Sequence, residues 1–203
     1  MDIKKLLPLF SYVFHPIFIS IYGLLIYLIT SKTAIFSSFT LLLVIQVLIL
    51  TLLLPLSIYF LLKATGYINS FTEATIQERK TPILLQIIFL ILLIKFSSLI
   101  NDIYILYYFF VGGLIAAVSA FMLTFVSIKI SLHMMGVCSL LAFTICLGLY
   151  LNTSLISLIA CEIFVVGSVA SSRLYMKSHS VSELISGSII GLISQIILWQ
   201  YYL

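Results

Sequence analysis

The sequence predicts an all-α fold, a polytopic bundle of about six to seven transmembrane helices. Of its 203 residues, 63% are hydrophobic and 8% are charged, whereas a soluble domain carries about 25% charged residues. The mean hydropathy is +1.31. Apolar runs close to the ~20 residues that a helix needs to cross the hydrocarbon core follow one another with short polar connections. No linker interrupts them, so we expect one integral membrane domain over residues 1–203.

The first two candidate spans are residues 8–30 and 39–62. The first contains no small-residue cleavage site, so we expect it to be a span rather than a cleaved signal peptide. It holds His15 directly before Pro16. We interpret this histidine as an interfacial residue.

Five further candidate spans follow at residues 82–99, 103–127, 133–151, 154–171 and 182–202. Glu162 and Lys95 lie at comparable depths inside two of them, and an ionisable group inside a membrane is a functional candidate. The two side chains could contact each other; alternatively, a protonated Glu162 bonds a serine hydroxyl, or Lys95 reaches the far interface. Gly187 and Gly191 form a small-xxx-small pair, which predicts close helix packing.

Three of the connections carry the densest polar clusters. If each span crosses the membrane once, connections 63–81, 128–132 and 172–181 fall on one face. The clusters in or beside them are Arg79 and Lys80, then Ser131 and His133, then Arg173, His179 and Glu183. Because connections on one face can converge, we expect a single site there.

The segment "SSRLYMKSHSVSELISG", residues 171–187, brings a cation, an imidazole and a carboxylate together. The planar guanidinium of Arg173 fits two phosphate oxygens, and His179 is suited to act as a nucleophile or proton shuttle. If a helix begins there, Glu183 shares a face with His179 and its carboxylate can accept the Nδ1–H, which leaves Nε2 free to attack. The alternative is a basic loop with a helix-capping serine and a first-turn glutamate.

The other two clusters supply complementary groups. In "KISLHMMG", His133 at the mouth of a span can protonate a departing oxygen, and Ser131 with the helix N–H groups can hold phosphate oxygens. In "QERKTP", Arg79 and Lys80 precede Pro82, which suits the first turn of a helix. Singly, these residues also fit an interfacial histidine and cations that flank a span. Together, the clusters form a set for phosphoryl transfer through a histidine.

Metal and cofactor motifs are absent from the sequence. The three cysteines lack metal-ligand spacing, and neither an Asp/His constellation nor a Gly-rich phosphate loop is present. We therefore expect no metal and no cofactor. The net charge of +4 suits an anionic headgroup or phosphate as well as ordinary flanking of spans. The expected partners are the bilayer and a membrane lipid phosphate, not a nucleic acid, and the oligomeric state is left open.

The segment "SRLYMKSHSVSE" resembles the third signature of the type-2 phosphatidic acid phosphatase superfamily, which reads Ser-Arg, five residues, His, three residues, Asp. "ISLH" resembles the second signature, Pro-Ser-Gly-His, with Ile130 and Leu132 in place of the proline and glycine. "ERKTP" resembles the end of the first signature, Lys, six residues, Arg-Pro, although Thr72 and Glu73 occupy the positions seven before the two cations. The chain is thus similar to a divergent member of that family.

The resemblance covers roughly residues 79–190 and implies a phosphatase-like core over 79–203, preceded by two extra spans within 8–62. It implies a metal-independent membrane lipid phosphatase. His179 would form a phosphohistidine, Glu183 would take the orienting role of the family's aspartate, and His133 would protonate the leaving group. The residues implied to bind the phosphate are Arg173, Ser131, and Arg79 or Lys80.

The resemblance implies hydrolysis of a phospholipid or isoprenyl phosphate or diphosphate. Phosphatidic acid, phosphatidylglycerol phosphate, an isoprenyl diphosphate and a lipid A phosphate are all compatible. The departures, Glu183 for aspartate, Leu132 for glycine and the missing lysine, leave a second function open. In that alternative the chain is a catalytically degenerate family member that acts as a lipid-binding or transport scaffold, with Glu162 and Lys95 as its polar relay.

The distribution of basic residues bears on orientation. The face of the expected site holds Lys4, Lys5, Lys63, Arg79, Lys80, Lys129, Arg173 and Lys177, whereas the other face holds Lys32 and Lys95. The positive-inside rule places the site in the cytoplasm. Bacterial members of the family that the chain resembles usually act on the outer side of the inner membrane. We expect a bacterial inner membrane, and both orientations remain open.

Overall fold

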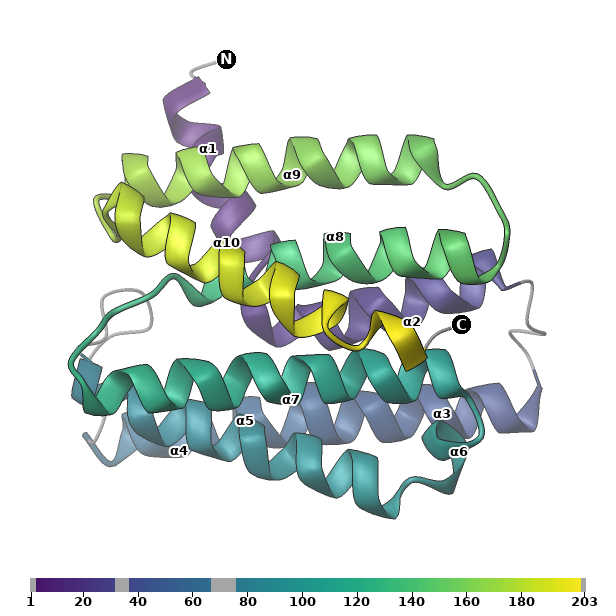
Figure 1. Cartoon of the computed structure of the whole chain (residues 1–203). Helices are drawn as coiled ribbons and strands as arrows, with labels where there is room; N and C mark the ends of the chain where they lie inside the picture. Colours follow the sequence, from purple (N-terminus) through teal and green to yellow (C-terminus); the bar gives the residue numbers. More distant parts are fainter. Residues whose placement is uncertain (1–2, 32–36, 67–75, 202–203) are drawn as a thin grey trace.

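The computed structural model describes residues 3–31, 37–66 and 76–201. Every regular element in these ranges is a helix, which confirms the all-α prediction. The long helices lie side by side as a bundle (Figure 1). In chain order the elements are α1 (Ile3–Val13), η1 (Pro16–Phe18), α2 (Ile19–Thr30), α3 (Ser38–Leu48), η2 (Ile49–Leu53), α4 (Leu54–Ala64), α5 (Ile76–Phe96), α6 (Ser98–Asn101), α7 (Tyr104–Phe125), α8 (Leu132–Tyr150), α9 (Ile156–Tyr175), α10 (Val181–Ile196) and η3 (Trp199–Tyr201).

Four helices within the described residues are long and apolar enough to cross a membrane. They are the continuous segment Ser38–Ala64 and helices α7, α8 and α9, and the bent pair Leu7–Val13 and Pro16–Thr30 raises the number to five. Helix α5 carries charged residues at both ends, and α10 has only 16 residues. The expected count of six to seven spans is therefore not confirmed. Large apolar side chains on the outer faces, such as Ile29 at 69% exposure and Phe164 at 68%, suit contact with lipid. The chain is an integral membrane protein.

The first predicted span is broken rather than continuous. Helix α1 ends at Val13, and the next helical segment starts at Pro16 and leaves at an angle of 41°. A proline disfavours helical geometry in the residue before it, and His15 is extended, with φ −65° and ψ 141°. Helix α1 then packs against α9. The predicted span over residues 8–30 is therefore a bent pair of helices, which can still count as one span.

The second predicted span is continuous but locally widened. Residues 38–64 are helical throughout, with a π-helical turn over Ile49–Leu53 just before Pro55. A π-helical turn relieves the clash between a proline ring and the preceding turn, because that carbonyl is no longer held in the regular helical bond. This turn contacts η1 and α5; Thr51 is buried there, whereas Ile49 and Leu53 are exposed.

The third predicted span begins earlier than expected. Helix α5 starts at Ile76, so Pro82 is its seventh residue and not part of its first turn. From "QERKTP" we expected the helix to begin at about Pro82, and it begins about two turns earlier. As a result, Arg79 and Lys80 are helical residues with directions fixed by α5, and consecutive helical residues point about 100° apart.

Helices α8 and α10 form the closest pair and run parallel (Figure 1). A Cβ on Gly187 would collide with the carbonyl of Ser131, and one on Gly191 with the carbonyl of Met135. Glycine permits this approach of two backbones because it has no side chain at the contact. The predicted packing role of the glycine pair is confirmed.

Candidate active site

The three polar connections meet at one end of the bundle, the left end in Figure 1. Lys129 Nζ donates to the Ser178 carbonyl at 3.0 Å, and Arg79 Nη1 donates to the Ile130 carbonyl at 3.2 Å. The Ser131 N–H donates to the Glu183 carbonyl at 3.0 Å. These bonds join the start of α5, the connection before α8 and the start of α10. The expected convergence on one face is confirmed for the described residues.

His179 and Glu183 form the contact that their spacing predicts. His179 Nδ1 donates to Glu183 Oε2 at 2.5 Å, across one turn at the start of α10. The Glu183 N–H also bonds Ser180 Oγ at 3.3 Å, so Ser180 caps the helix. The serine cap that the alternative predicts and the predicted contact between Glu183 and His179 are therefore both present. Because the carboxylate accepts a hydrogen bond from Nδ1–H, the single proton of the neutral ring stays on Nδ1. Nε2 therefore keeps its lone pair.

Burial keeps His179 neutral. Its side chain is 1% exposed, and this desolvation lowers the pKa from 6.5 to about 4, although the hydrogen bond to Glu183 opposes the change. The charges of Arg79, Arg173 and Lys129 lower the pKa further. At neutral pH the imidazole thus carries one proton, on Nδ1.

The pH profile should report this buried imidazole. If His179 is the nucleophile that the resemblance implies, its Nε2 must be unprotonated, and kcat/KM for phosphate release should persist between pH 6.5 and about 4 and fall only below about 4. Initial rates of phosphate release at constant ionic strength would measure it. Glu183→Gln removes the charge that raises this pKa and should move the acid limb lower still, while titration of the substrate stays unchanged. An acid limb near 6.5 in both proteins would contradict the assignment.

Two guanidinium groups face the same space. Arg173, in the last turn of α9, is 2% exposed, and its Nε has no hydrogen-bond partner among the described residues. It lies close enough to Arg79 for the two charges to repel each other. Arg79 is half-buried, and the charge of Glu183 acts on it as well. Two cations in the wall of one cavity favour an anion there.

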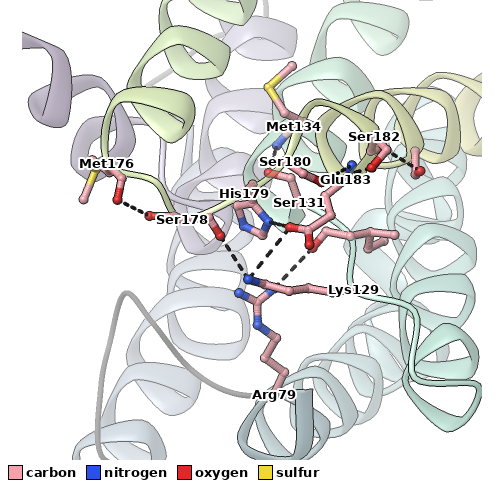
Figure 2. A network of polar contacts seen from close by, with 12 residues as sticks. Arg79, Lys129, Ser131, Met134, Met176, Ser178, His179, Ser180, Ser182 and Glu183 are labelled. Carbon is pink, nitrogen blue, oxygen red and sulfur yellow. Dashed lines mark hydrogen bonds and ion pairs between the residues drawn. The ribbon is translucent and has the colours of Figure 1, made fainter.

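The structure separates Arg79 from Lys80. Arg79 lines the cavity described below, whereas Lys80 Nζ sits 4.9 Å from the centre of the Phe125 ring. Lys129, which sequence analysis treated only as a flanking charge, takes a place in the site, with Nζ 3.8 Å from Glu183 Oε2. Figure 2 shows Arg79 and Lys129 approaching Glu183 and His179 from one side.

Ser131 is placed in the helix junction rather than in the cavity wall. It is fully buried, its Oγ accepts from the Met134 N–H at 3.4 Å, and it caps α8. Its backbone joins α10, as described above. The cavity wall carries Leu132 and His133 from this signature.

The N-terminal segment supplies the partners of His133. Since a carbonyl only accepts, His133 Nε2 carries a proton and donates it to the Ser11 carbonyl at 3.1 Å. The His15 ring meets the His133 ring edge to face at 5.0 Å between centroids. Ser11 Oγ also bonds Ser172 Oγ at 2.6 Å. Sequence analysis left this segment outside the site, and only the histidine before Pro16 gave a signal of its position.

His15 is suited to be a neutral hydrogen-bond donor to a ligand in the cavity. Its Nδ1 accepts from the Ile17 N–H at 3.3 Å, which leaves the proton on Nε2, and the residue lines the cavity. If the cavity binds the lipid phosphate that the resemblance implies, His15→Phe and His15→Ala should both reduce kcat/KM by about 10- to 100-fold, the effect of losing a hydrogen bond to a charged group. Steady-state phosphate release measures it. Full activity in His15→Phe together with reduced activity in His15→Ala would show that the His15 ring only packs against His133.

These groups share one cavity of about 650 Å³. Its charged and titratable lining residues are His15, Glu78, Arg79, His133, Arg173 and His179. The remainder is mostly apolar wall from α2, α4, α5, α7 and α8. A cavity of this size with a few polar groups at one end is typical of a small-molecule site.

Glu162 and Lys95 do not form the contact considered above. Glu162 is 8% exposed and its Oε1 accepts from Thr144 Oγ1 at 2.8 Å, while Lys95 is exposed near the end of α5. The alternative of a bond between Glu162 and a hydroxyl group is therefore correct, although the hydroxyl belongs to a threonine and not to a serine. Oε2 has no partner among the described residues, which is costly for a buried carboxyl.

Two further expectations concern the first signature and metals. Thr72 and Glu73, the positions that depart from the first signature, lie outside the described residues. Within the described ranges, no group of three His, Cys, Asp or Glu residues could hold a metal ion. No family model, curated protein or solved structure matches the chain.

Proposed function

We propose that the protein is a membrane lipid phosphatase that transfers the phosphoryl group to Nε2 of His179. One observation carries this proposal: a buried neutral imidazole, oriented by a carboxylate, lines the same cavity as one buried and one half-buried guanidinium group. An oriented nucleophile and a preorganised anion site are the two parts that phosphoryl transfer requires.

The proposed reaction has two steps. The lipid phosphate enters with one proton on its phosphate group. Nε2 of His179 attacks the phosphorus atom, and the bond from phosphorus to the lipid oxygen breaks. Since His133 Nε2 donates to the Ser11 carbonyl, Nδ1 is the nitrogen that faces the reaction; it accepts the phosphate proton and passes it to the departing lipid oxygen. Water then attacks the phosphohistidine, Nδ1 of His133 accepts a proton from the water and returns it to the phosphate, and the N–P bond breaks to release phosphate. Arg79 and Arg173 neutralise the oxygens throughout.

The departures from the resembled family are compatible with this chemistry. Glu183 is longer than aspartate, yet it reaches His179 Nδ1 at 2.5 Å. The first signature lacks its lysine, because Thr72 and Glu73 occupy the corresponding positions. Lys129 adds a cation beside the His179–Glu183 pair. Leu132 lines the cavity and contributes a side chain where the family has glycine.

Phosphate release by purified protein in detergent tests the proposal. The substrates are phosphatidic acid, phosphatidylglycerol phosphate, an isoprenyl diphosphate and a lipid A phosphate. We expect release from at least one of them and none from His179→Ala. Absence of release from all four, with folded protein, would favour the degenerate lipid-binding scaffold.

We propose further that α5 and α10 also cross the bilayer, which makes seven spans, with the site end in the cytoplasm of a bacterial cell. Helix α5 packs against α7, and α10 against α8 along its length, and basic residues gather at the site end. Cysteines introduced at the exposed Tyr175 and Thr153 mark opposite ends of α9. In intact cells, an impermeant maleimide should label only Thr153→Cys; labelling of only Tyr175→Cys would place the site outside.

A further inference from the structure

The apolar part of the cavity continues from the polar site into the middle of the bundle. Along α5 the wall extends from Arg79 to Leu90, which is about 16 Å at 1.5 Å per residue. Helix α7, which packs against α5, contributes Phe109, Phe110 and the small residues that follow them. A lipid whose phosphate lies between the guanidinium groups would therefore have its tail inside the protein.

The cavity is also large enough for such a ligand. At about 650 Å³, it lies within the range of small-molecule sites and has room for a phosphate and a lipid tail.

Small residues keep the inner part of the cavity open. Gly113, Ala116 and Ala117 on α7 and Gly136 on α8 line it. A Cβ on Gly113 would meet no atom within 4 Å. Gly113 lies twelve residues from the end of α7 at Phe125, about 18 Å from the polar end. A larger side chain here would project into the space for the distal tail.

We propose that this chamber receives a lipid tail and that Gly113 determines the tail length the protein accepts. The ligand class is a lipid phosphate with a tail in the chamber. The inference deepens the proposed function, since it uses the same polar site for the head group, but tail binding does not depend on hydrolysis.

Alkylphosphonic acids with tails of six to sixteen carbons test the chamber, because their C–P bond is not cleaved by the proposed reaction. Affinity for the full-length protein in lipid nanodiscs is measured by thermal shift against the free aqueous concentration. Each buried methylene should tighten binding about fourfold, equivalent to ~0.8 kcal/mol, until the chamber is full. Beyond that length the increase should stop.

Gly113→Leu should move this limit to tails about four carbons shorter, one for each carbon that the leucine side chain adds. Gly167→Leu is the matched control, because Gly167 is also helical with open space around its Cβ and lies exposed on α9 outside the cavity. If Gly113→Leu does not fold, Gly113→Ala replaces it, with a limit about one carbon shorter. An unchanged profile in the folded Gly113 variant, or affinity that rises without limit in the wild type, would overturn the proposal.

The two proposals fail separately. A limit that moves with Gly113, without phosphate release from any lipid, would retain the chamber and reject hydrolysis. Phosphate release combined with an unchanged limit would retain the phosphatase and reject the chamber.

Discussion

Replacing His179 by alanine should reduce phosphate release by on the order of 10⁴-fold or more, the effect of removing a nucleophile from a site that acts as a unit. In the proposed reaction, Nε2 of the imidazole forms the covalent bond to phosphorus. In the alanine variant, Glu183 would not hold a water molecule in the same orientation to replace it. Single-turnover experiments with a radiolabelled lipid phosphate would measure both the release and the acid-labile phosphoenzyme. The phosphoenzyme should disappear in His179→Ala.

Glu183→Gln is the graded companion of this variant. The glutamine can still accept the Nδ1–H but lacks the charge that stabilises the developing imidazolium. The phosphoenzyme should still form, more slowly than in the wild type. Equal activity in the wild type and His179→Ala, with equal yield and thermal stability, would reject the phosphohistidine mechanism.

Gly191→Ala should destabilise the protein strongly although it adds only one methyl group. The new Cβ would collide with the Met135 carbonyl and lie 3.0 Å from the Ser139 nitrogen, both of which belong to the α8 backbone. Helix α10 must then move away from α8, and overpacking of this kind costs about 1–3 kcal/mol or more. For a chain of this length, Tm should fall by roughly 5–10 °C. Thermal unfolding in detergent, followed by light scattering or fluorescence, measures the change.

Gly167→Ala is the control, and it should have the opposite sign. Nothing lies within 4 Å of its Cβ position, and alanine stabilises a helix interior by about 0.5–1 kcal/mol relative to glycine. If both variants change Tm equally, the close approach of α8 and α10 is not the cause. Since the movement of α10 would carry Glu183 away from Lys129, Gly191→Ala should also lower activity in the fraction that remains folded.

Part of the site could be predicted because it depends on spacing within one segment. His179 and Glu183 are four residues apart at the start of a helix, and helical geometry alone brings their side chains together. The convergence of three connections followed from counting the spans. The choice between Arg79 and Lys80 could not be made this way, because it depends on the direction each side chain takes from α5, and α5 starts six residues earlier than predicted.

The contributions of the N-terminal segment could not be predicted from local pattern. His15 and His133 are more than one hundred residues apart, and their contact requires the bend at Pro16 and the packing of α1 on α9. The same holds for Ser11, whose carbonyl accepts the hydrogen bond from His133 and whose hydroxyl bonds Ser172. A lone histidine before a proline signals a break in a span but does not indicate which side of the bundle it faces.

The sequence by itself determined that this chain is helical, membrane-embedded and polar at one end, because hydropathy and span length follow from the composition of each segment. It also determined the pairing of His179 with Glu183, since a helix repeats every 3.6 residues. The tertiary structure decided which cations face the imidazole, that His15 joins the site, and that the site opens into a chamber with Gly113 in its wall. These features depend on the way helices distant in sequence pack against one another, and packing is fixed by the shapes of facing side chains over the whole bundle.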